Sequence, residues 1–282
     1  MPEAGASHAT TVAFYDLGGS GPPLLLAHAT GFHGRVWGPL VEGLAEHFRC
    51  ASFDQRGHGE TPAPADGDFD WKGLADDALA VVDVAGLERP FGFGHSAGAT
   101  ALLLAEAARP GTFRALYCYE PVVLPPDAET RGRHASAAQA LAAAARRRRE
   151  VFHSRQEAYE HYAGKPPFSS LHPGALRAYV DHGFDDLDDG RVRLKCRAES
   201  EARTYEMGQR HDAWDRMTGI TCPVTVACGA LSDGFGPAVA ALQASRLATG
   251  RTEAFAELGH FGPLQEPPAV ASAVCRALLP LS

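Results

Sequence analysis

Two short segments of this chain carry a hydroxyl and an imidazole of the kinds used in nucleophilic catalysis. Ser96 lies at the centre of a Gly-His-Ser-Ala-Gly segment, residues 94–98, which matches the pattern G-x-S-x-G. His260 lies in a Gly-His-Phe-Gly-Pro segment, residues 259–263, near the far end of the chain. An imidazole can take the proton of a serine hydroxyl and later return it to a leaving group. We therefore expect Ser96 to be a nucleophile and His260 to be its base.

A carboxylate is needed to orient the imidazole, and two positions could supply it. Asp233 follows a predicted strand at residues 223–228, and Glu120 follows another predicted strand that ends at residue 119. A carboxylate in either place can accept from the imidazole N–H and fix its tautomer. We favour Asp233 and keep Glu120 as the alternative. Asp233 could also simply cap the following helix.

The segment His28-Ala-Thr-Gly-Phe32 follows a short apolar run and suits an oxyanion-binding loop. Acyl transfer passes through a tetrahedral oxyanion, and losing one preorganised N–H donor costs about 3 kcal/mol. The expected donors are the backbone N–H groups of Thr30 and of Ala97. We expect His28 to order the loop rather than to transfer protons.

Substrate contacts are expected from residues adjoining these groups. Phe32 and His33 follow the oxyanion loop, while His95 and Phe261 are the chain neighbours of Ser96 and His260. The basic run at residues 146–149 is expected to be a solvated helix end.

The elements that must position these groups alternate between strands and helices, which favours a mostly parallel sheet covered on both faces. Apolar runs predict strands at residues 11–17, 23–27, 48–53, 90–94, 113–119, 223–228 and 252–256. Helical spacing predicts helices at residues 39–47, 71–85, 97–108, 237–247 and 267–279. Ser96 would then lie on a sharp strand-to-helix turn that raises its hydroxyl above the sheet edge.

The middle of the chain does not continue this alternation of strands and helices. Residues 125–219 are mainly polar and predict helices at 135–149, 156–162 and 175–180, with a short strand at 191–195. We interpret this block as a cap inserted into a core made of residues 1–124 and 220–282.

The composition narrows the classes of function that the chain can have. The 282 residues are 45% hydrophobic and carry a formal net charge of −8, which supports a packed core and no general attraction to nucleic acid or anionic membrane. The six cysteines lack metal-site spacing and are expected to be free, although a Cys222–Cys228 bridge is possible on spacing alone. We expect a cytoplasmic protein that acts on a small molecule. The oligomeric state stays open, a homodimer included.

Taken in chain order, these motifs resemble the α/β-hydrolase superfamily, and an Asp-Gln-Arg-Gly-His-Gly segment at residues 54–59 adds to the likeness. The resemblance covers residues 10–124 and 220–280. It implies a Ser96, Asp233 and His260 triad, an oxyanion hole at Thr30 and Ala97, a structural role for residues 54–59, and no metal or cofactor. Ala29 stands where many relatives have glycine.

The resulting hypothesis is a hydrolase of small esters, thioesters or lactones that forms an acyl-enzyme. Dehalogenases and epoxide hydrolases of this fold need an aspartate nucleophile, and position 96 is serine. A carbon–carbon bond hydrolase or an acyltransferase with the same triad stays open. A ligand-binding receptor without catalysis is the remaining alternative.

Overall fold

The computed structural model describes residues 3–5 and 11–282, whose main feature is an eight-stranded sheet. Its strand order is β1-β2-β4-β3-β5-β6-β10-β11. The strands are β1 (Glu3–Gly5), β2 (Thr11–Gly18), β3 (Pro23–Ala27), β4 (Arg49–Phe53), β5 (Phe91–His95), β6 (Leu116–Tyr119), β10 (Val224–Gly229) and β11 (Gly250–Phe255).

The sheet is mostly parallel, as the sequence predicted. Strands β4, β3, β5, β6, β10 and β11 run parallel to one another, and β2 pairs antiparallel with both β4 and β1 at one edge. Consecutive side chains of a strand point to opposite faces, so a strand that is apolar throughout needs cover on both sides. In β3, Leu25 and Ala27 enter a first core cluster, whereas Leu24 and Leu26 enter a second one.

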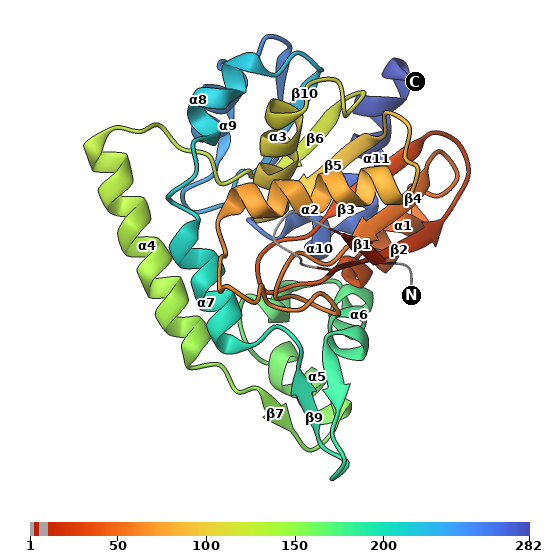
Figure 1. The fold of residues 1–282 in the computed structure, drawn as a ribbon, viewed down its shortest axis with the longest axis vertical. Coiled ribbons are helices and arrows are strands. Elements are labelled where there is room, and N and C mark those ends of the chain that lie inside the picture. The colour runs from red at the N-terminus through yellow and green to blue at the C-terminus, as the bar shows by residue number, and fades with distance from the viewer. Residues whose placement is uncertain (1–2, 6–10) are drawn as a thin grey trace.

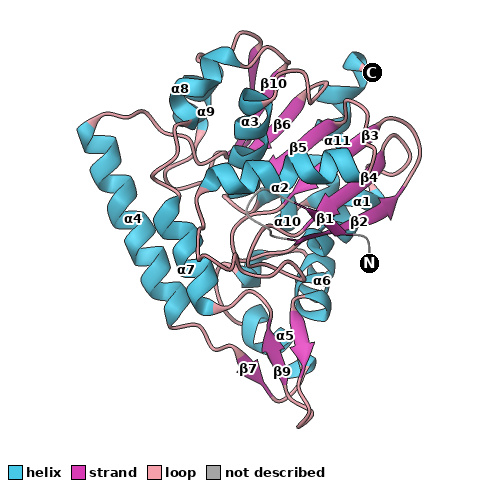
Figure 2. Cartoon of the chain, in the orientation of Figure 1, coloured by secondary structure: helices cyan, strands magenta, loops and turns pink. Residues whose placement is uncertain are grey.

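Helices cover both faces of the sheet (Figure 2). Side chains of α2 (Trp71–Val84), α3 (Ala97–Ala108) and α9 (Pro237–Ala244) belong to the first cluster. Those of α1 (Gly38–Glu42) and α11 (Pro267–Leu278) belong to the second. The α/β-hydrolase fold expected from the sequence is therefore confirmed, with α1 ending five residues earlier than the 39–47 helix that we predicted.

Residues 125–219, the inserted segment, lie mostly beyond one edge of the sheet (Figure 1). Their helices are α4 (Ala128–Arg146), α5 (Arg155–Ala163), α6 (Pro173–His182), α7 (Ala198–Met207) and α8 (Ala213–Arg216). Three short strands, β7 (Val151–Phe152), β8 (Phe184–Asp186) and β9 (Val192–Leu194), form a small antiparallel sheet. The sequence did not predict α7, which packs along α4, and it placed the start of α4 seven residues too late.

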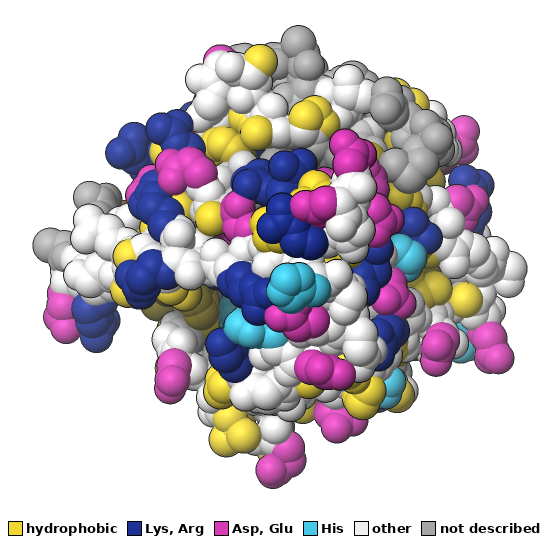
Figure 3. All heavy atoms as spheres, turned by 90° about the horizontal axis from the view of Figure 1, so that it is seen from below, with side chains coloured by type: hydrophobic (Ala, Val, Ile, Leu, Met, Phe, Trp, Pro, Cys, Tyr) yellow, Lys and Arg dark blue, Asp and Glu magenta, His cyan; other side chains and the backbone are white. Residues whose placement is uncertain are grey.

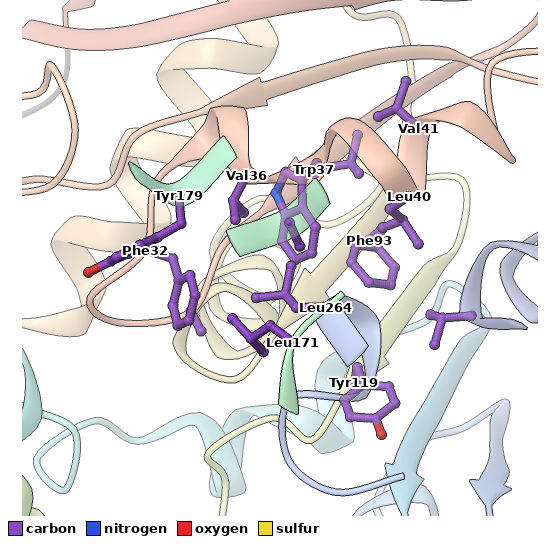
Figure 4. Close-up of a cluster of buried hydrophobic side chains, with 14 of the residues drawn as sticks. Phe32, Val36, Trp37, Leu40, Val41, Phe93, Tyr119, Leu171, Tyr179 and Leu264 are labelled. Carbon is purple, nitrogen blue, oxygen red and sulfur yellow. The ribbon is translucent and has the colours of Figure 1, made fainter. Parts of the chain in front are cut away.

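The second core cluster continues from the sheet into the inserted segment. Figure 4 shows Leu171 and Tyr179 of that segment beside Phe32 and Leu264 of the sheet side. The Phe32 and Tyr179 rings meet edge to face with their centroids 5.3 Å apart. This part of the inserted segment is therefore anchored to the loop that follows β3.

All six cysteines are free thiols, Cys222 and Cys228 included, and only Cys275 is not fully buried. Burial raises the pKa of the Cys228 thiol to about 11, so it stays protonated at neutral pH. Within the described ranges, no helix has the length and apolar character needed to cross a membrane.

Candidate active site

The candidate site lies where the parallel strands end. Thr30 follows β3, Ser96 follows β5, Glu120 follows β6 and His260 follows β11. Because parallel strands present their carboxyl ends at the same edge, loops that are far apart in sequence meet there. The topology therefore brings the hydroxyl, the imidazole and a carboxylate to one edge of the sheet.

Ser96 occupies the sharp turn between β5 and α3. Its backbone has φ of 55° and ψ of −118°, a conformation that L-residues rarely adopt and that often marks a functional site. Glycines on either side make the turn possible, since a Cβ at Gly94 would meet the backbone of Ala99 and one at Gly98 would meet that of Ala27. The Ser96 side chain thus stands at the N-terminal, positive end of α3.

His260 is held by Glu120. The Nδ1 atom of His260 lies 2.6 Å from Oε2 of Glu120, and the glutamate side chain is fully buried. A carboxylate can only accept, so Nδ1 carries the proton and Nε2 is left as the free, basic nitrogen. This is the tautomer that a general base toward a serine hydroxyl requires.

Three donors hold the Glu120 carboxylate in place. Besides His260, the backbone N–H of Gly229 donates to Oε1 at 2.8 Å and the hydroxyl of Ser232 donates to Oε2 at 2.7 Å. The Glu120 backbone has a positive φ of 47°, which turns the chain sharply after β6. A buried charge is tolerated when its lone pairs are filled in this way.

Asp233 does not take the position expected of it. Its side chain is exposed at the rim of the cavity and makes no hydrogen bond or ion pair with any described residue. The loop after β10 instead presents its neighbour Ser232 to Glu120. The predicted contact between Asp233 and His260 is therefore wrong, and the alternative that we kept open, Glu120, is the partner of the imidazole.

Ser96 and His260 line one cavity of about 430 Å³. Thr30 and Phe261 belong to its wall, together with apolar side chains from α4, α7 and the loop after β10; these are Ala137, Ala138, Leu141, Tyr205, Leu231 and Phe235. The predicted nucleophile and base are thus brought to the same space, and the inserted segment forms part of its enclosure.

Two backbone N–H groups at this cavity have no acceptor. Ala97 is the first residue of α3, where N–H groups lack intrahelical partners, and Thr30 lies on the loop after β3. Among the described residues, neither N–H donates a hydrogen bond. Both N–H groups are therefore available as donors, which an oxyanion hole requires.

Two buried histidines shape the loop that carries Thr30. His58 accepts the N–H of Gly31 at 3.0 Å through Nε2, and His28 accepts the N–H of Gln55 at the same distance. Burial lowers the pKa of His58 to about 4 and holds that of His28 well below its usual range, so both rings are neutral. Their roles are structural, as we expected for His28.

The Asp-Gln-Arg-Gly-His-Gly segment, residues 54–59, supports this loop. Asp54 accepts the N–H of Gly34 at 2.6 Å, just beyond the oxyanion loop. Arg56 forms a buried ion pair with Asp77 of α2, with Nη2 and Oδ1 2.8 Å apart. The segment, which is the loop after β4, therefore connects the loop after β3 to α2.

The four predicted substrate contacts fall into two groups. Phe261 lines the Ser96 cavity and Phe32 lines an adjoining one. His33 is buried instead, with Nε2 3.2 Å from the carbonyl oxygen of Tyr179. His95 is also buried, with Nε2 2.7 Å from the carbonyl oxygen of His260. Neither histidine lines the cavity, so the structure does not support either as a substrate contact.

Sequence reasoning missed the residues that complete the site. Ser232 and Gly229 lie on the loop of Asp233, and they hold Glu120. Leu141 and Tyr205 come from α4 and α7, whose packing partner could not be inferred from sequence. The one available signal was that two acidic residues, Glu120 and Asp233, follow neighbouring strands.

Comparisons with known proteins show the family of the chain. The model of the "Alpha/beta hydrolase family" matches residues 24–273. A 2-(acetamidomethylene)succinate hydrolase from Mesorhizobium japonicum is 28% identical over 211 residues, covering 75% of this chain and 71% of the relative. A pimeloyl-[acyl-carrier protein] methyl ester esterase from Methylococcus capsulatus is 36% identical over 36% of this chain and 38% of its own.

Solved structures share the whole architecture. The crystal structure of E-2-(acetamidomethylene)succinate hydrolase superposes with a TM-score of 0.82 at 21% identity and covers 98% of both chains. The enol-lactonase from Burkholderia xenovorans LB400 gives a TM-score of 0.73 at 21% identity over 99% of this chain and 100% of its own. At this level of identity the likeness concerns the fold.

Proposed function

Because the chain belongs to the alpha/beta hydrolase family, we propose that it is a serine hydrolase that cleaves an ester, thioester or lactone of a small organic substrate. The observation that carries the proposal is the meeting of Ser96 and His260 in one cavity, with the imidazole oriented by a buried carboxylate at 2.6 Å. The catalytic acid of this triad is Glu120.

The proposed reaction begins with attack of the Ser96 hydroxyl on the acyl carbon. His260 takes the hydroxyl proton at Nε2, and the Glu120 carboxylate stabilises the imidazolium that forms. The N–H groups of Thr30 and Ala97 bind the developing oxyanion. The imidazolium then protonates the leaving oxygen or sulfur, and water releases the acyl group from Ser96 by the same steps.

Relatives support the hydrolase class and leave the bond open. Their names include a succinate derivative, a methyl ester and, among structural neighbours, an enol lactone. In an ester or lactone, the group that Ser96 displaces is an oxygen, which His260 can protonate directly. Carbon–carbon bond hydrolysis by the same three residues is the competing activity, and the substrate panel below distinguishes it.

The test is a panel of p-nitrophenyl esters of rising acyl length, thioesters and lactones. We expect turnover by the wild-type protein and a loss of at least about 10³-fold in Ser96→Ala. Ser272→Ala, an exposed serine on α11 whose hydroxyl bonds only to the Pro268 carbonyl, is the matched control and should keep wild-type rates.

Two results would overturn the proposal. Equal rates in Ser96→Ala and the wild type would show that Ser96 is not the nucleophile. If the protein hydrolysed no ester, thioester or lactone but cleaved a carbon–carbon bond next to a ketone, it would be a carbon–carbon bond hydrolase.

A further inference from the structure

A second cavity of about 510 Å³ opens beside the Ser96 cavity. The two spaces share four lining residues, namely Thr30, Leu141, Tyr205 and Phe261. Thr30 carries one of the two unpaired N–H groups, so the second cavity begins at the proposed oxyanion hole. A substrate with its reacting carbonyl at Ser96 can therefore extend into it.

This second cavity, here called the basic pocket, is lined by more positive than negative side chains. It contains four cations, Arg147, Arg148, Arg149 and Lys165, against one carboxylate, Glu201. The chain as a whole has a formal net charge of −8, so the charge of this pocket is opposite in sign to that of the whole chain. Figure 3 views the molecule from the side of the inserted segment and shows Lys, Arg and His side chains gathered beside a hollow.

Two of the four cations are already engaged. Arg148 pairs with Glu201 and donates to the hydroxyls of Tyr179 and Tyr162 at 2.6 and 3.2 Å. Arg149 pairs with a glutamate of α5, with its Nη2 atom 2.7 Å from the carboxylate oxygen. Both guanidinium groups are therefore neutralised by the protein.

The other two cations are free to bind a ligand. Arg147 and Lys165 are exposed, and neither pairs with a carboxylate in the described part of the chain. The Lys165 ammonium lies 3.3 Å from Nε2 of His161. An imidazole carries no negative charge, so this contact leaves the charge of Lys165 uncompensated. The Tyr162 hydroxyl, which accepts from Arg148, still has its own proton to donate. Two unpaired cations and a hydroxyl donor are thus assembled in one cavity.

We propose that the basic pocket binds an anionic oxygen group, a carboxylate or a phosphate, of the substrate whose carbonyl reacts at Ser96. This inference rests on the function proposed above and specifies its substrate class. Arg147 and Lys165 supply the charge, and Tyr162 supplies a hydrogen bond. Leu141 and Phe261, which line the passage between the two spaces, call for an apolar spacer between the anion and the carbonyl.

Matched pairs of methyl esters test this assignment. Monomethyl succinate, glutarate, adipate and suberate each carry a terminal carboxylate. Methyl butyrate, pentanoate, hexanoate and octanoate are their neutral counterparts of equal acyl length. Methanol release gives kcat/KM for each ester. We expect the acidic ester to be preferred by about 10-fold or more at one or two spacer lengths, and this preference to shrink when salt is raised.

The variant Arg147→Gln/Lys165→Gln should reduce the acidic-to-neutral ratio of kcat/KM by about 10-fold, chiefly through KM. Arg251→Gln is the matched control, because Arg251 is likewise exposed and pairs with no carboxylate of the described residues, but lies on β11, outside both cavities. Thermal unfolding should show that all variants are folded. A phosphate monoester of a hydroxyacyl methyl ester, compared in the same way, separates phosphate from carboxylate recognition.

Failure of this inference can be separated from failure of the proposed function. Turnover of neutral and acidic esters with equal kcat/KM, unchanged in the double variant, would overturn the basic pocket and leave the hydrolase intact. An absence of Ser96-dependent turnover on any ester would instead overturn the proposed function.

Discussion

The carboxyl edge of the sheet and the inserted segment hold their side chains in different ways. At the edge, the contact between His260 and Glu120 is supported by side chains that bond to backbone groups: His58 to the N–H of Gly31, Glu120 to the N–H of Gly229, and His95 to the carbonyl of His260. Because the backbone is fixed by the strands, these positions follow from topology. The side chains at the carboxyl edge are thus placed by the fold itself.

In the inserted segment, the contacts between α4 and α7 are made by side chains on both sides. Helices α4 and α7 meet through small residues, Ala142, Ala145 and Ala202, and through ion pairs between their ends. Arg146 pairs with Glu199 and Glu206, and Arg148 pairs with Glu201. The walls of the cavities therefore depend on individual side-chain contacts, which single substitutions can change without altering the sheet.

The largest effect should come from the acid at the sheet edge. Glu120→Gln removes the carboxylate that fixes the His260 tautomer, and kcat should fall by about 10³–10⁴-fold. Asp233→Asn, at an exposed residue on the cavity rim, should change kcat by less than about 3-fold. Steady-state kinetics on a p-nitrophenyl ester measures both. The reverse order of effects would return the role to Asp233.

The difference between the sheet edge and the inserted segment also explains which residues could be predicted from the sequence. Ser96 and His260 were found because a strand-turn-helix context and a loop position define them locally. The sequence offered two candidates for the acid and could not decide between them, because Glu120 and Asp233 both follow strands that end at the same edge. Only the turn at Glu120, with its φ of 47°, and the donors from Gly229 and Ser232 decide between them.

The inserted segment was predictable only in outline. Its helical character and the start of β9 follow from composition and spacing, but α7 carries its apolar positions on a polar background and was missed. The basic run at residues 146–149 was expected to be solvated. Arg146, Arg147 and Arg149 are indeed exposed, whereas Arg148 is mostly buried against Glu201, which lies far along the chain.

A second prediction probes that buried pair in the inserted segment. Arg148→Met leaves the Glu201 carboxylate, which is 7% exposed, without its ion-pair partner, and the free energy of unfolding should fall by about 3 kcal/mol. Chemical denaturation measures the change. Adding Glu201→Gln should recover part of the loss. Full stability in Arg148→Met alone would show that the pair does not hold the segment.

A third prediction concerns acid stability at the sheet edge. The folded-state pKa of His58 is about 4, below its ordinary value of 6.5, so the unfolded chain binds a proton more readily. Stability is full above pH 6.5 and is lost as the pH falls toward 4, by about 2 kcal/mol from this group between pH 7 and pH 5. Urea denaturation across this range checks the slope, which should be smaller in His58→Gln. A flat profile would contradict the neutral, accepting role of the ring.

The smallest effect is expected at the exposed end of α4. Arg146→Gln breaks ion pairs to Glu199 and Glu206 whose side chains are exposed to solvent, and such pairs add little to stability because water screens them. Denaturation should show a change well below that of Arg148→Met. Comparable losses in the two variants would show that the buried and the exposed ion pairs contribute equally to stability.

The most direct test of the account is covalent labelling of the nucleophile. A fluorophosphonate probe followed by peptide mass spectrometry should place the label on Ser96 in the wild-type protein, with labelling strongly slowed in His260→Ala. Labelling of another residue, or equal labelling rates in the wild type and His260→Ala, would contradict the central claim that Ser96 is activated by His260.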